Sequence, residues 1–365
     1  MRTVTSSDSP AKILEVTSYP PPRAGWGIRV EFLKKRLERE GHECVVLNIG
    51  TSRRIPSTEY ETVMSGMDFV RKVWRYSRRG FVVHAHANGD SPTGLMLALL
   101  AELLNLASGR RPYLTFHAGV IQRHFPKDRS RLLAPVFRLV FTLPRHIICN
   151  SEPVRRCISE YGIDPAKITA IPAFSREYLE FTRVDLPGEV EAFMRTKPVT
   201  VFTYLRMRPL FYPVTLIDGM AQVMAKRPDV GLVICGGLGH SDPGVWPAVQ
   251  AAIERHQLKD RICFVEDLDH DAFLTMLERS ALYLRTPITD GVASSVLEAL
   301  ALGIPVVGCE NGTRPAGVVT YPAEDPDRLA EAVLDVLERR SEVRSSLARI
   351  ELPDTVATEV ELLTA

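Results

Sequence analysis

The sequence predicts an α/β protein of two doubly wound, Rossmann-like domains, and three observations lead to this fold class. The chain has 365 residues, enough for about two domains at roughly 150 residues each. Short β-branched or apolar runs alternate with longer amphipathic stretches, which is the pattern of βαβ units. A charged stretch over residues 173–197, broken by prolines, interrupts this alternation once and indicates a boundary.

The expected organisation follows from that boundary. An N-terminal domain covers residues 1–175, a linker 176–197 and a C-terminal domain 198–349, and we expect the tail, 350–365, to return to the N-terminal domain. Strands are predicted at 13–16, 43–47, 81–85, 113–116, 146–149 and 168–171, then at 199–204, 231–235, 262–264, 282–284 and 305–307. Helices are predicted at about 28–40, 59–78, 92–107, 132–141 and 152–161, then at about 212–226, 247–256, 271–279, 292–302 and 327–340. Ligands of such folds bind outside the carboxyl ends of the strands, so we expect a cleft where the two domains face each other.

Composition excludes several classes of protein. Apolar residues make up 45% and charged residues 24%, which are ordinary globular values, and the net charge of +1 does not suggest nucleic-acid binding. The six cysteines are scattered without a C-x-x-C pair, as in proteins of a reducing compartment. The N-terminus lacks the apolar core of a signal peptide, and the longest apolar stretch, 94–107, is too short to cross a bilayer. We therefore expect a cytoplasmic protein.

Charge is distributed unevenly along the chain. Residues 71–145 contain thirteen Lys and Arg but only three acids. A surface polarised in this way attracts anionic partners. Two interpretations are open for the aromatic residues among these arginines. They form a core face opposite solvated charges, or the segment is an amphipathic surface that docks on anionic lipid head groups.

One segment of the second half combines the features of a phosphate site. A predicted strand ends near Arg285, a loop follows, and a helix begins at about residue 292. The free amides and the dipole of a helix start favour an anionic ligand. Glu298 lies farther along this helix and can accept hydrogen bonds from a sugar diol. In the alternative interpretation Glu298 is an exposed helix residue, and Ser294 and Ser295 are only helix caps.

The run D-G-x-x-x-S-x-L-E-A-L-A-x-G-x-P-V-V over residues 290–307 resembles the donor-binding segment of GT-B glycosyltransferases of family GT4. The family motif is an acid, seven residues and a Glu, which correspond here to Asp290 and Glu298. The resemblance implies that Glu298 binds the nucleotide ribose and that Asp290 lies by the donor sugar, although the family usually has Glu at that first position. It also implies that the backbone between them binds the diphosphate, through Gly291, Val292, Ala293, Ser294 and Ser295.

Segments of the first half extend the resemblance over nearly the whole chain. Gly25, Trp26 and Gly27 resemble the family's glycine-rich loop on the acceptor side, where glycine lets the backbone approach a ligand closely. His86 and His117 follow the third and fourth predicted strands. The resemblance implies that His117 reaches the donor sugar, while His86 belongs to the acceptor side. A lone histidine at a strand end is, in the alternative interpretation, structural.

The family also places an Arg and a Lys on the diphosphate, five residues apart. Arg206 corresponds to the Arg, but Phe211 stands where the family has the Lys. One lost charge-assisted contact is worth about 1.5–3 kcal/mol, so we expect Arg208 or the helix-start amides to compensate. Gly236 and Gly237 resemble the family's glycine turn near the phosphates.

The resemblance implies a retaining, metal-independent hexosyltransferase that needs no cofactor. Its substrates would be a nucleotide sugar, with a UDP-sugar expected before a GDP- or ADP-sugar, and a saccharide or lipid-linked acceptor. Bacterial surface polysaccharide or glycolipid synthesis is the corresponding setting, with the protein peripheral on the inner face of the membrane. Two alternatives are a GT-B-fold sugar-nucleotide epimerase and an inactive nucleotide-sugar-binding protein. The D-x-D run of Asp267 and Asp269 resembles a metal site, but it also suits the start of a helix.

Overall fold

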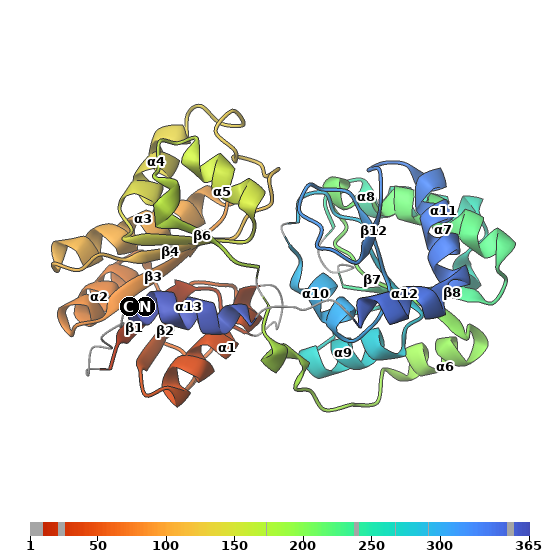
Figure 1. The fold of residues 1–365 in the computed structure, drawn as a ribbon, viewed down its shortest axis with the longest axis horizontal. Helices are drawn as coiled ribbons and strands as arrows, with labels where there is room; N and C mark the ends of the chain where they lie inside the picture. Colours follow the sequence, from red (N-terminus) through yellow and green to blue (C-terminus); the bar gives the residue numbers. More distant parts are fainter. Residues whose placement is uncertain are drawn as a thin grey trace. The chain divides into compact units, whose positions relative to one another are not determined.

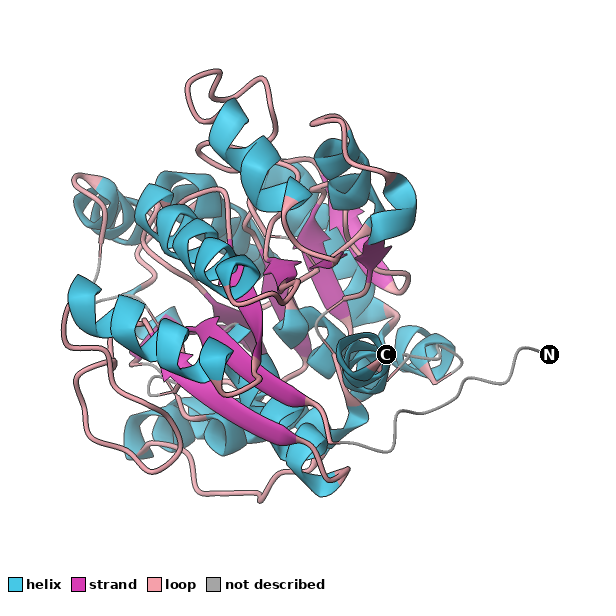
Figure 2. Ribbon diagram, turned by 90° about the vertical axis from the view of Figure 1, so that its left-hand side faces the viewer, coloured by secondary structure: helices cyan, strands magenta, loops and turns pink. Residues whose placement is uncertain are grey.

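The computed structural model describes residues 10–20, 26–172, 174–236, 241–266, 268–290, 292–348 and 354–365. The chain divides into two compact units (Figure 1). Unit 1 comprises residues 1–177 and 353–365, and unit 2 comprises residues 178–352. The described part of each unit contains a parallel sheet of six strands with helices around it (Figure 2). The predicted α/β fold class is confirmed.

Unit 1 is built on a sheet of strand order β2-β1-β3-β4-β5-β6. Its strands are β1 (Lys12–Thr17), β2 (Glu43–Asn48), β3 (Val82–Ala87), β4 (Tyr113–Phe116), β5 (His146–Cys149) and β6 (Ile168–Ala170). Its helices are α1 (Trp26–Arg39), α2 (Gly66–Arg78), α3 (Pro92–Ala107), α4 (Ala134–Thr142), α5 (Glu152–Ser159) and α13 (Thr355–Thr364), with short 3-10 turns η1 (Pro165–Lys167) and η2 (Arg176–Leu179). The central strands are buried on both faces, which explains their nearly continuous apolar sequence.

The register of this sheet brings four polar side chains of its centre together. Glu15 of β1 pairs with His84 of β3, and His86 of β3 pairs with Thr115 of β4. Because side chains alternate between the two faces of a strand, His84 and His86 point to the same face. The sheet therefore places a carboxylate and two imidazoles in one layer.

The C-terminal helix belongs to the N-terminal unit. α13 packs against α1, and Figure 1 shows the blue end of the chain beside the red beginning. Asp354 caps α13 by accepting a hydrogen bond from the amide of Ala357, and the amide of Thr355 donates to the carbonyl of Phe174. Val356, Val360 and Leu363 of this helix are buried.

Unit 2 has a sheet of strand order β12-β11-β10-β7-β8-β9. Its strands are β7 (Val199–Tyr204), β8 (Val230–Cys235), β9 (Ile262–Val265), β10 (Leu282–Arg285), β11 (Val306–Cys309) and β12 (Val318–Tyr321). Its helices are α6 (Gly188–Thr196), α7 (Pro213–Lys226), α8 (Val245–Arg255), α9 (His270–Arg279), α10 (Ser294–Ala301), α11 (Pro326–Glu338) and α12 (Arg340–Leu347), with 3-10 turns η3 (Pro209–Phe211) and η4 (Lys259–Arg261). Two apolar clusters, one on each side of the sheet, form its core.

Several predicted elements differ from the structure. Helix α2 begins at Gly66 and not near residue 59, because Ser65 accepts a hydrogen bond from the amide of Asp68 and Asp68 accepts one from Met64. The stretch 176–197 contains α6, of which only Val190 is buried, so its apolar pattern is weak. β12, α12 and α13 were not predicted either.

No helix among the described residues has the length and apolar content to cross a membrane.

Candidate functional site

The start of α10 in unit 2 is open. Ala293 is the N-cap residue and makes no side-chain capping bond, whereas Asp269 caps α9 and Asp325 caps α11. The amides of Ser294 and Ser295 donate to no residue that the structure describes. Free amides at a helix start carry partial positive charge and can bind an anion such as a diphosphate. Ser294 and Ser295 are therefore not caps, and that alternative interpretation is wrong.

Glu298 is buried on α10 and only 3% exposed. Its Oε1 lies 3.4 Å from Nε2 of His270, the first residue of α9. On the same helix, the hydroxyl of Ser295 accepts a hydrogen bond of 2.9 Å from the Tyr283 hydroxyl. The interpretation of Glu298 as an exposed helix residue is wrong, and its carboxylate lies one turn from the open helix start.

Asp290 is held by cations of its own unit. Its Oδ2 and Oδ1 accept hydrogen bonds of 2.7 and 3.0 Å from Nε and Nη2 of Arg285, and Arg314 Nη1 lies 3.7 Å from Oδ2. The backbone carbonyl of Asp290 accepts a further bond from Asn311. A bidentate pair of this kind fixes the carboxylate plane and so the loop before α10.

A different cation lies where the family lysine is missing. The guanidinium of Arg285 lies 6.0 Å from the Phe211 ring centre. Arg206 follows β7, with its guanidinium 5.3 Å from the centre of the Tyr204 ring, while Arg208 is exposed. Arg285 is a cation of this region that the sequence interpretation missed.

The remaining predicted residues of unit 2 are placed only in part. Gly236 follows β8 with a φ of 87°, a left-handed conformation that favours glycine. Val292, which lies two residues before the start of α10, is half-buried. Gly237, Gly291 and Asp267 lie outside the described residues.

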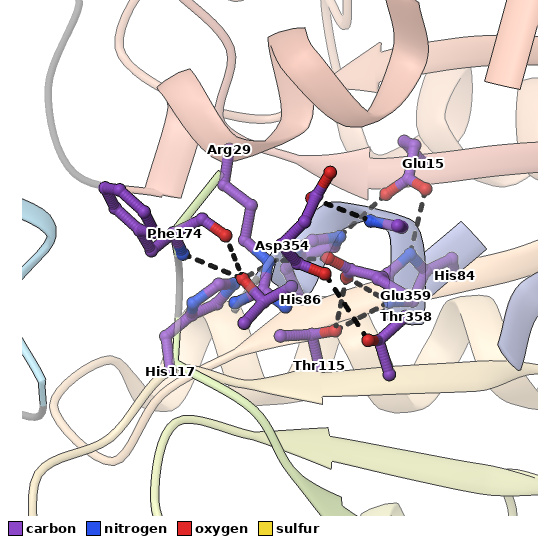
Figure 3. A network of polar contacts seen from close by, with 12 residues as sticks. Glu15, Arg29, His84, His86, Thr115, His117, Phe174, Asp354, Thr358 and Glu359 are labelled. Carbon is purple, nitrogen blue, oxygen red and sulfur yellow. Dashed lines mark hydrogen bonds and ion pairs between the residues drawn. The ribbon is translucent and has the colours of Figure 1, made fainter. Parts of the chain in front are cut away.

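His117 of unit 1 lies at the end of β4, beside His86 of β3. Nε2 of His117 is 2.8 Å from Nδ1 of His86 (Figure 3). The amide of His117 donates to the carbonyl of Ala87. Both imidazoles are buried, with exposed fractions of 7% and 4%. Burial lowers the pKa of both rings, and a neighbouring histidine lowers each further, His86 for His117 and His84 for His86. Arg29 adds to the effect at His117, whereas Glu15 opposes it at His86, and the net direction is downward for both rings.

Glu15 lies behind His86 and connects it to His84. Its Oε2 is 2.7 Å from Nε2 of His86, and its Oε1 is 2.8 Å from Nδ1 of His84 (Figure 3). Burial alone would raise the pKa of the Glu15 carboxyl, but His84 and His86 outweigh it and lower this pKa to about 2. Glu15 is therefore a carboxylate. For His84, burial lowers the pKa while Glu15 raises it, and the net direction is upward.

A second buried carboxylate comes from the C-terminal helix. Glu359 of α13 accepts a 2.6 Å bond from Nε of Arg29 on α1, and these side chains are 0% and 1% exposed. Thr115 links this pair to the histidines, since its hydroxyl is 2.7 Å from His84 Nε2 and 3.4 Å from Glu359 Oε1. The network thus joins α1, β1, β3, β4 and α13 (Figure 3).

Glu15, His84 and His86 are side-chain types that bind metals, and their ligand atoms lie within 4.8 Å of one another. Their short contacts, however, pair each carboxylate oxygen with one imidazole nitrogen at hydrogen-bond length. Both carboxylates of the network already have partners, since Glu15 contacts the two histidines and Glu359 pairs with Arg29. We therefore interpret this cluster as a hydrogen-bond network.

The acceptor-side loop is described only in part. Gly25 lies outside the described residues, and Trp26 begins α1, but only its backbone is described. A Cβ added at Gly27 would lie 3.4 Å from Cδ of Pro20 and 3.6 Å from the carbonyl of Ser18. The start of α1 therefore passes close to the chain that follows β1.

Sequence interpretation missed four members of the unit 1 network: Glu15, Arg29, Thr115 and Glu359. A signal for Glu15 existed, because a Glu interrupts the apolar run of its strand and His84-Ala85-His86 places two imidazoles on one face of another. No local signal indicated Glu359, which lies 330 residues from Arg29.

Two family models match the chain. Residues 191–350 match the model described as Glycosyl transferases group 1, and residues 24–174 match the one described as Glycosyltransferase Family 4. One subunit of the human phosphatidylinositol N-acetylglucosaminyltransferase is 25% identical over 174 residues, which are 47% of this chain. The match covers 33% of that protein, so the chain spans about a third of the length of this relative.

Solved structures share the fold. Sucrose-phosphate synthase from Thermosynechococcus elongatus superposes with a TM-score of 0.71 at 16% identity, over 96% of this chain and 98% of that one. Alr3699/HepE from Anabaena, in complex with UDP-glucose, gives a TM-score of 0.70 at 14% identity over 96% and 97%. Because the two family models together span most of the chain and its fold is that of these proteins, the chain belongs to the group 1 glycosyltransferases, which have the GT-B fold.

Proposed function

We propose that the protein transfers a hexose from a UDP-sugar to a lipid-linked saccharide or lipid acceptor at a membrane surface, with retention at the anomeric carbon and without a metal ion. Bacterial surface polysaccharide or glycolipid synthesis is the proposed setting. The observation that carries the proposal is the open start of α10 one turn before the buried Glu298. The UDP-glucose named with Alr3699/HepE and the phosphatidylinositol named in the human relative support the choice of donor and acceptor.

The roles of the residues follow from the charges that develop in the reaction. The nucleotide diphosphate leaves as an anion, and the amides of Ser294 and Ser295 together with Arg206 stabilise it. Glu298 accepts hydrogen bonds from the ribose hydroxyls, while His117 and Asp290 orient the transferred sugar.

Donor binding tests the site at α10. We expect UDP-glucose to raise the melting temperature of the protein more than GDP- or ADP-glucose does. Glu298→Gln removes a charge-assisted contact and should weaken UDP-glucose binding about ten- to hundredfold in calorimetry. Glu338→Gln, on the exposed side of α11, is the matched control. Equal affinity of the Glu298 variant and the control would contradict the role of Glu298.

The stereochemistry and the metal requirement have their own test. The anomeric proton coupling of the first product, read by NMR before any mutarotation, should show the configuration of the donor. Transfer should continue at an undiminished rate in excess EDTA. An inverted product, or activity that EDTA removes and Mg²⁺ or Mn²⁺ restores, would contradict the proposal.

A surface of unit 1 supports the membrane-bound acceptor. α2, α3 and α4 are consecutive neighbours, and we call their solvent side the α2–α4 face. Exposed apolar residues lie on it: Met67, Trp74, Met96, Leu100, Leu103, Leu132 and Leu139. Exposed arginines accompany them: Arg71, Arg78, Arg79, Arg123, Arg129, Arg131 and Arg138. Apolar side chains among cations are the composition of surfaces that bind anionic lipid.

Part of the positive charge of residues 71–145 is neutralised within the unit. Arg71 pairs with Asp68, and Arg75 and Lys72 lie 3.3 and 3.6 Å from Glu61. In contrast, the arginines around α4 form no ion pair with any residue of the described ranges: Arg123, Arg129, Arg131 and Arg138. The α4 side of the face is therefore its main basic region.

Vesicle binding tests the α2–α4 face. Each cation near an anionic surface contributes about 1 kcal/mol, so exchanging Arg129, Arg131 and Arg138 for Gln should weaken binding to vesicles with phosphatidylserine about a hundredfold. The double variant Arg195→Gln and Arg344→Gln, at exposed positions of unit 2, is the control for loss of positive charge outside the α2–α4 face. Equal binding of the wild type to neutral and anionic vesicles, or no binding at all, would contradict a membrane-surface acceptor.

A second candidate function has an observation in its favour. The bidentate pair with Arg285 occupies the Asp290 carboxylate, and Phe211 replaces a cation of the family. Both features suit a protein that binds a nucleotide sugar without transferring it. Saturable binding of UDP-glucose combined with no release of UDP over a panel of lipid and saccharide acceptors would favour this function.

A further inference from the structure

Two buried arginines of unit 2 share one acid. Arg285 is the last residue of β10, and Arg314 lies in the loop that follows β11. Their side chains are 7% and 3% exposed, while that of Asp290 is 15% exposed. Arg285 bonds both oxygens of the Asp290 carboxylate, whereas Nη1 of Arg314 lies 3.7 Å from Oδ2 and has no hydrogen-bond partner among the described residues. We call these three residues the arginine cluster, in which one acid faces two cations.

Backbone carbonyls hold the Arg314 side chain in place. Its Nε donates to the carbonyl of Cys309 at 2.9 Å, and its Nη2 donates to the carbonyl of Pro287 at 2.8 Å. Carbonyl groups accept hydrogen bonds but carry no net charge. Burial outweighs the attraction of Asp290 and lowers the pKa of the Arg314 guanidinium, as it does for a buried charge that is not fully balanced. The carbonyls therefore fix this guanidinium without neutralising it.

No second acid of the described residues forms an ion pair with the arginine cluster. Glu310, which follows β11, and Glu324, which follows β12, are exposed, so water screens their charges. Glu298 is buried, but its carboxylate lies beside His270 and makes no ion pair with either arginine. The cluster therefore carries one net positive charge.

The arginine cluster adjoins the open start of α10. Asp290 precedes the N-cap residue Ala293 by three positions. Arg285 follows Tyr283 by two positions on β10, and the Tyr283 hydroxyl donates to Ser295 of α10. Because buried charges are screened much less than exposed ones, the cluster acts through space on an anion at this helix start. Its net charge and the helix amides thus favour the same kind of ligand.

We propose that the arginine cluster supplies a buried positive charge that stabilises the diphosphate of a nucleotide bound at the start of α10. The inference rests on the proposed function where it names the ligand, since the proposed donor is a nucleoside diphosphate sugar. The charge favours a diphosphate over a monophosphate, because the second phosphate adds negative charge to the ligand. During transfer, the same charge stabilises the diphosphate that leaves as an anion.

A comparison of UDP with UMP measures the effect of the charge. We expect Arg314→Gln to bind UDP about tenfold more weakly than the wild type does in calorimetry, and UMP less than about threefold more weakly. Distortion of the loop before α10 would instead lower the affinity for both nucleotides by the same factor, and this result would overturn the inference. Arg261→Gln, which also removes a guanidinium bonded to backbone carbonyls of unit 2, is the matched control and should bind both nucleotides as the wild type does.

Further variants separate the charge from the shape of the arginine side chain. Arg314→Lys keeps the positive charge but loses the forked contacts, so its affinity for UDP should stay within about threefold of the wild type. The guanidinium of Arg285 lies 6.0 Å from the Phe211 ring centre, so Phe211→Lys adds a cation beside the cluster. In Arg314→Gln protein, Phe211→Lys should restore most of the lost affinity for UDP, and Phe211→Leu should restore none. A Lys variant as weak as the Gln variant, or no gain from Phe211→Lys, would overturn the inference.

Other nucleotide pairs separate the charge effect from the proposed function. GDP with GMP, and ADP with AMP, test the charge independently of the preference for a base. A wild type that binds diphosphates in the expected pattern but transfers no hexose contradicts only the proposed function. A wild type that transfers hexose but binds each diphosphate no more tightly than its monophosphate contradicts only the inference. Absence of binding for all of these nucleotides would contradict both.

Discussion

The buried side chain of Glu102 lowers the stability of unit 1. It lies on α3 with no exposed surface, and neither carboxyl oxygen has a hydrogen-bond partner among the described residues. Burial raises the pKa of this carboxyl well above its ordinary value of 4.5. Buried polar groups without partners cost about 1–3 kcal/mol. In the sequence, Glu102 is the acid that interrupts the longest apolar stretch.

Glu102→Met should therefore stabilise the protein by about 1–3 kcal/mol at pH 8. Because the folded-state pKa is raised, the wild type loses stability as pH rises from 4.5 through that pKa, and the advantage of the variant grows over the same range. Urea unfolding at pH 5 and pH 8 measures both effects. The exposed Glu160→Met is the control, and an advantage that shrinks with rising pH would contradict the account.

Glu15 gives the opposite dependence on pH. Its folded pKa of about 2 lies below the ordinary 4.5, so its contribution is present above pH 4.5 and is lost as pH falls toward 2. The partner His84 has a raised pKa, so its contribution is complete below 6.5 and is lost at higher pH. Glu15→Gln should thus cost most between about pH 4.5 and 6.5, by roughly 3 kcal/mol. Urea unfolding from pH 3 to 9 measures this loss of stability, with Glu160→Gln as the reference variant. A loss that does not change with pH would contradict the prediction.

At the scale of elements, α13 is held by a buried ion pair. Removing one partner of such a pair leaves an uncompensated charge and costs about 3–5 kcal/mol. Glu359→Leu should therefore destabilise the protein strongly, while Arg29→Leu combined with Glu359→Leu should cost less than the single change. Urea unfolding of the two single variants and the double variant measures the coupling. Additive costs would mean that the pair does not act as a unit.

The sequence predicted strands better than it predicted contacts between distant segments. Tyr113–Phe116 and His146–Cys149 are predicted to the residue because each is a buried parallel strand between helices. β12 was missed since only Tyr321 of its four residues is buried at the sheet edge. The candidate site residues show the same difference between local patterns and distant contacts. Glu298 follows from a contiguous motif, whereas the pairing of Arg29 with Glu359 depends on how α13 folds back.

At the scale of the whole molecule, the two units differ in how the chain builds them. All six strands of the unit 2 sheet come from residues 178–352, whereas unit 1 needs its C-terminal residues. The fragment 178–352 should therefore unfold cooperatively by itself. The fragment 1–177 leaves Arg29 without Glu359 and should be less stable by about 3–5 kcal/mol than unit 1 with α13.

A peptide of residues 353–365 provides the complementary experiment. Added in excess to the fragment 1–177, it should raise the melting temperature measured by circular dichroism. The same peptide carrying Glu359→Gln should have little effect, because it cannot balance the Arg29 charge. A rise with both peptides would assign the docking to the apolar contacts of α13 alone.

The return of α13 to unit 1 also sets the order in which the protein matures during synthesis. The ribosome makes Arg29, Glu15 and the three histidines well before Glu359, which lies 330 residues after Arg29. The earlier part of unit 1 must therefore wait, with its charges unbalanced, until α13 has been made and has left the exit tunnel. A chain that stops before α13 thus has an unfinished unit 1, which exposes it to proteolysis.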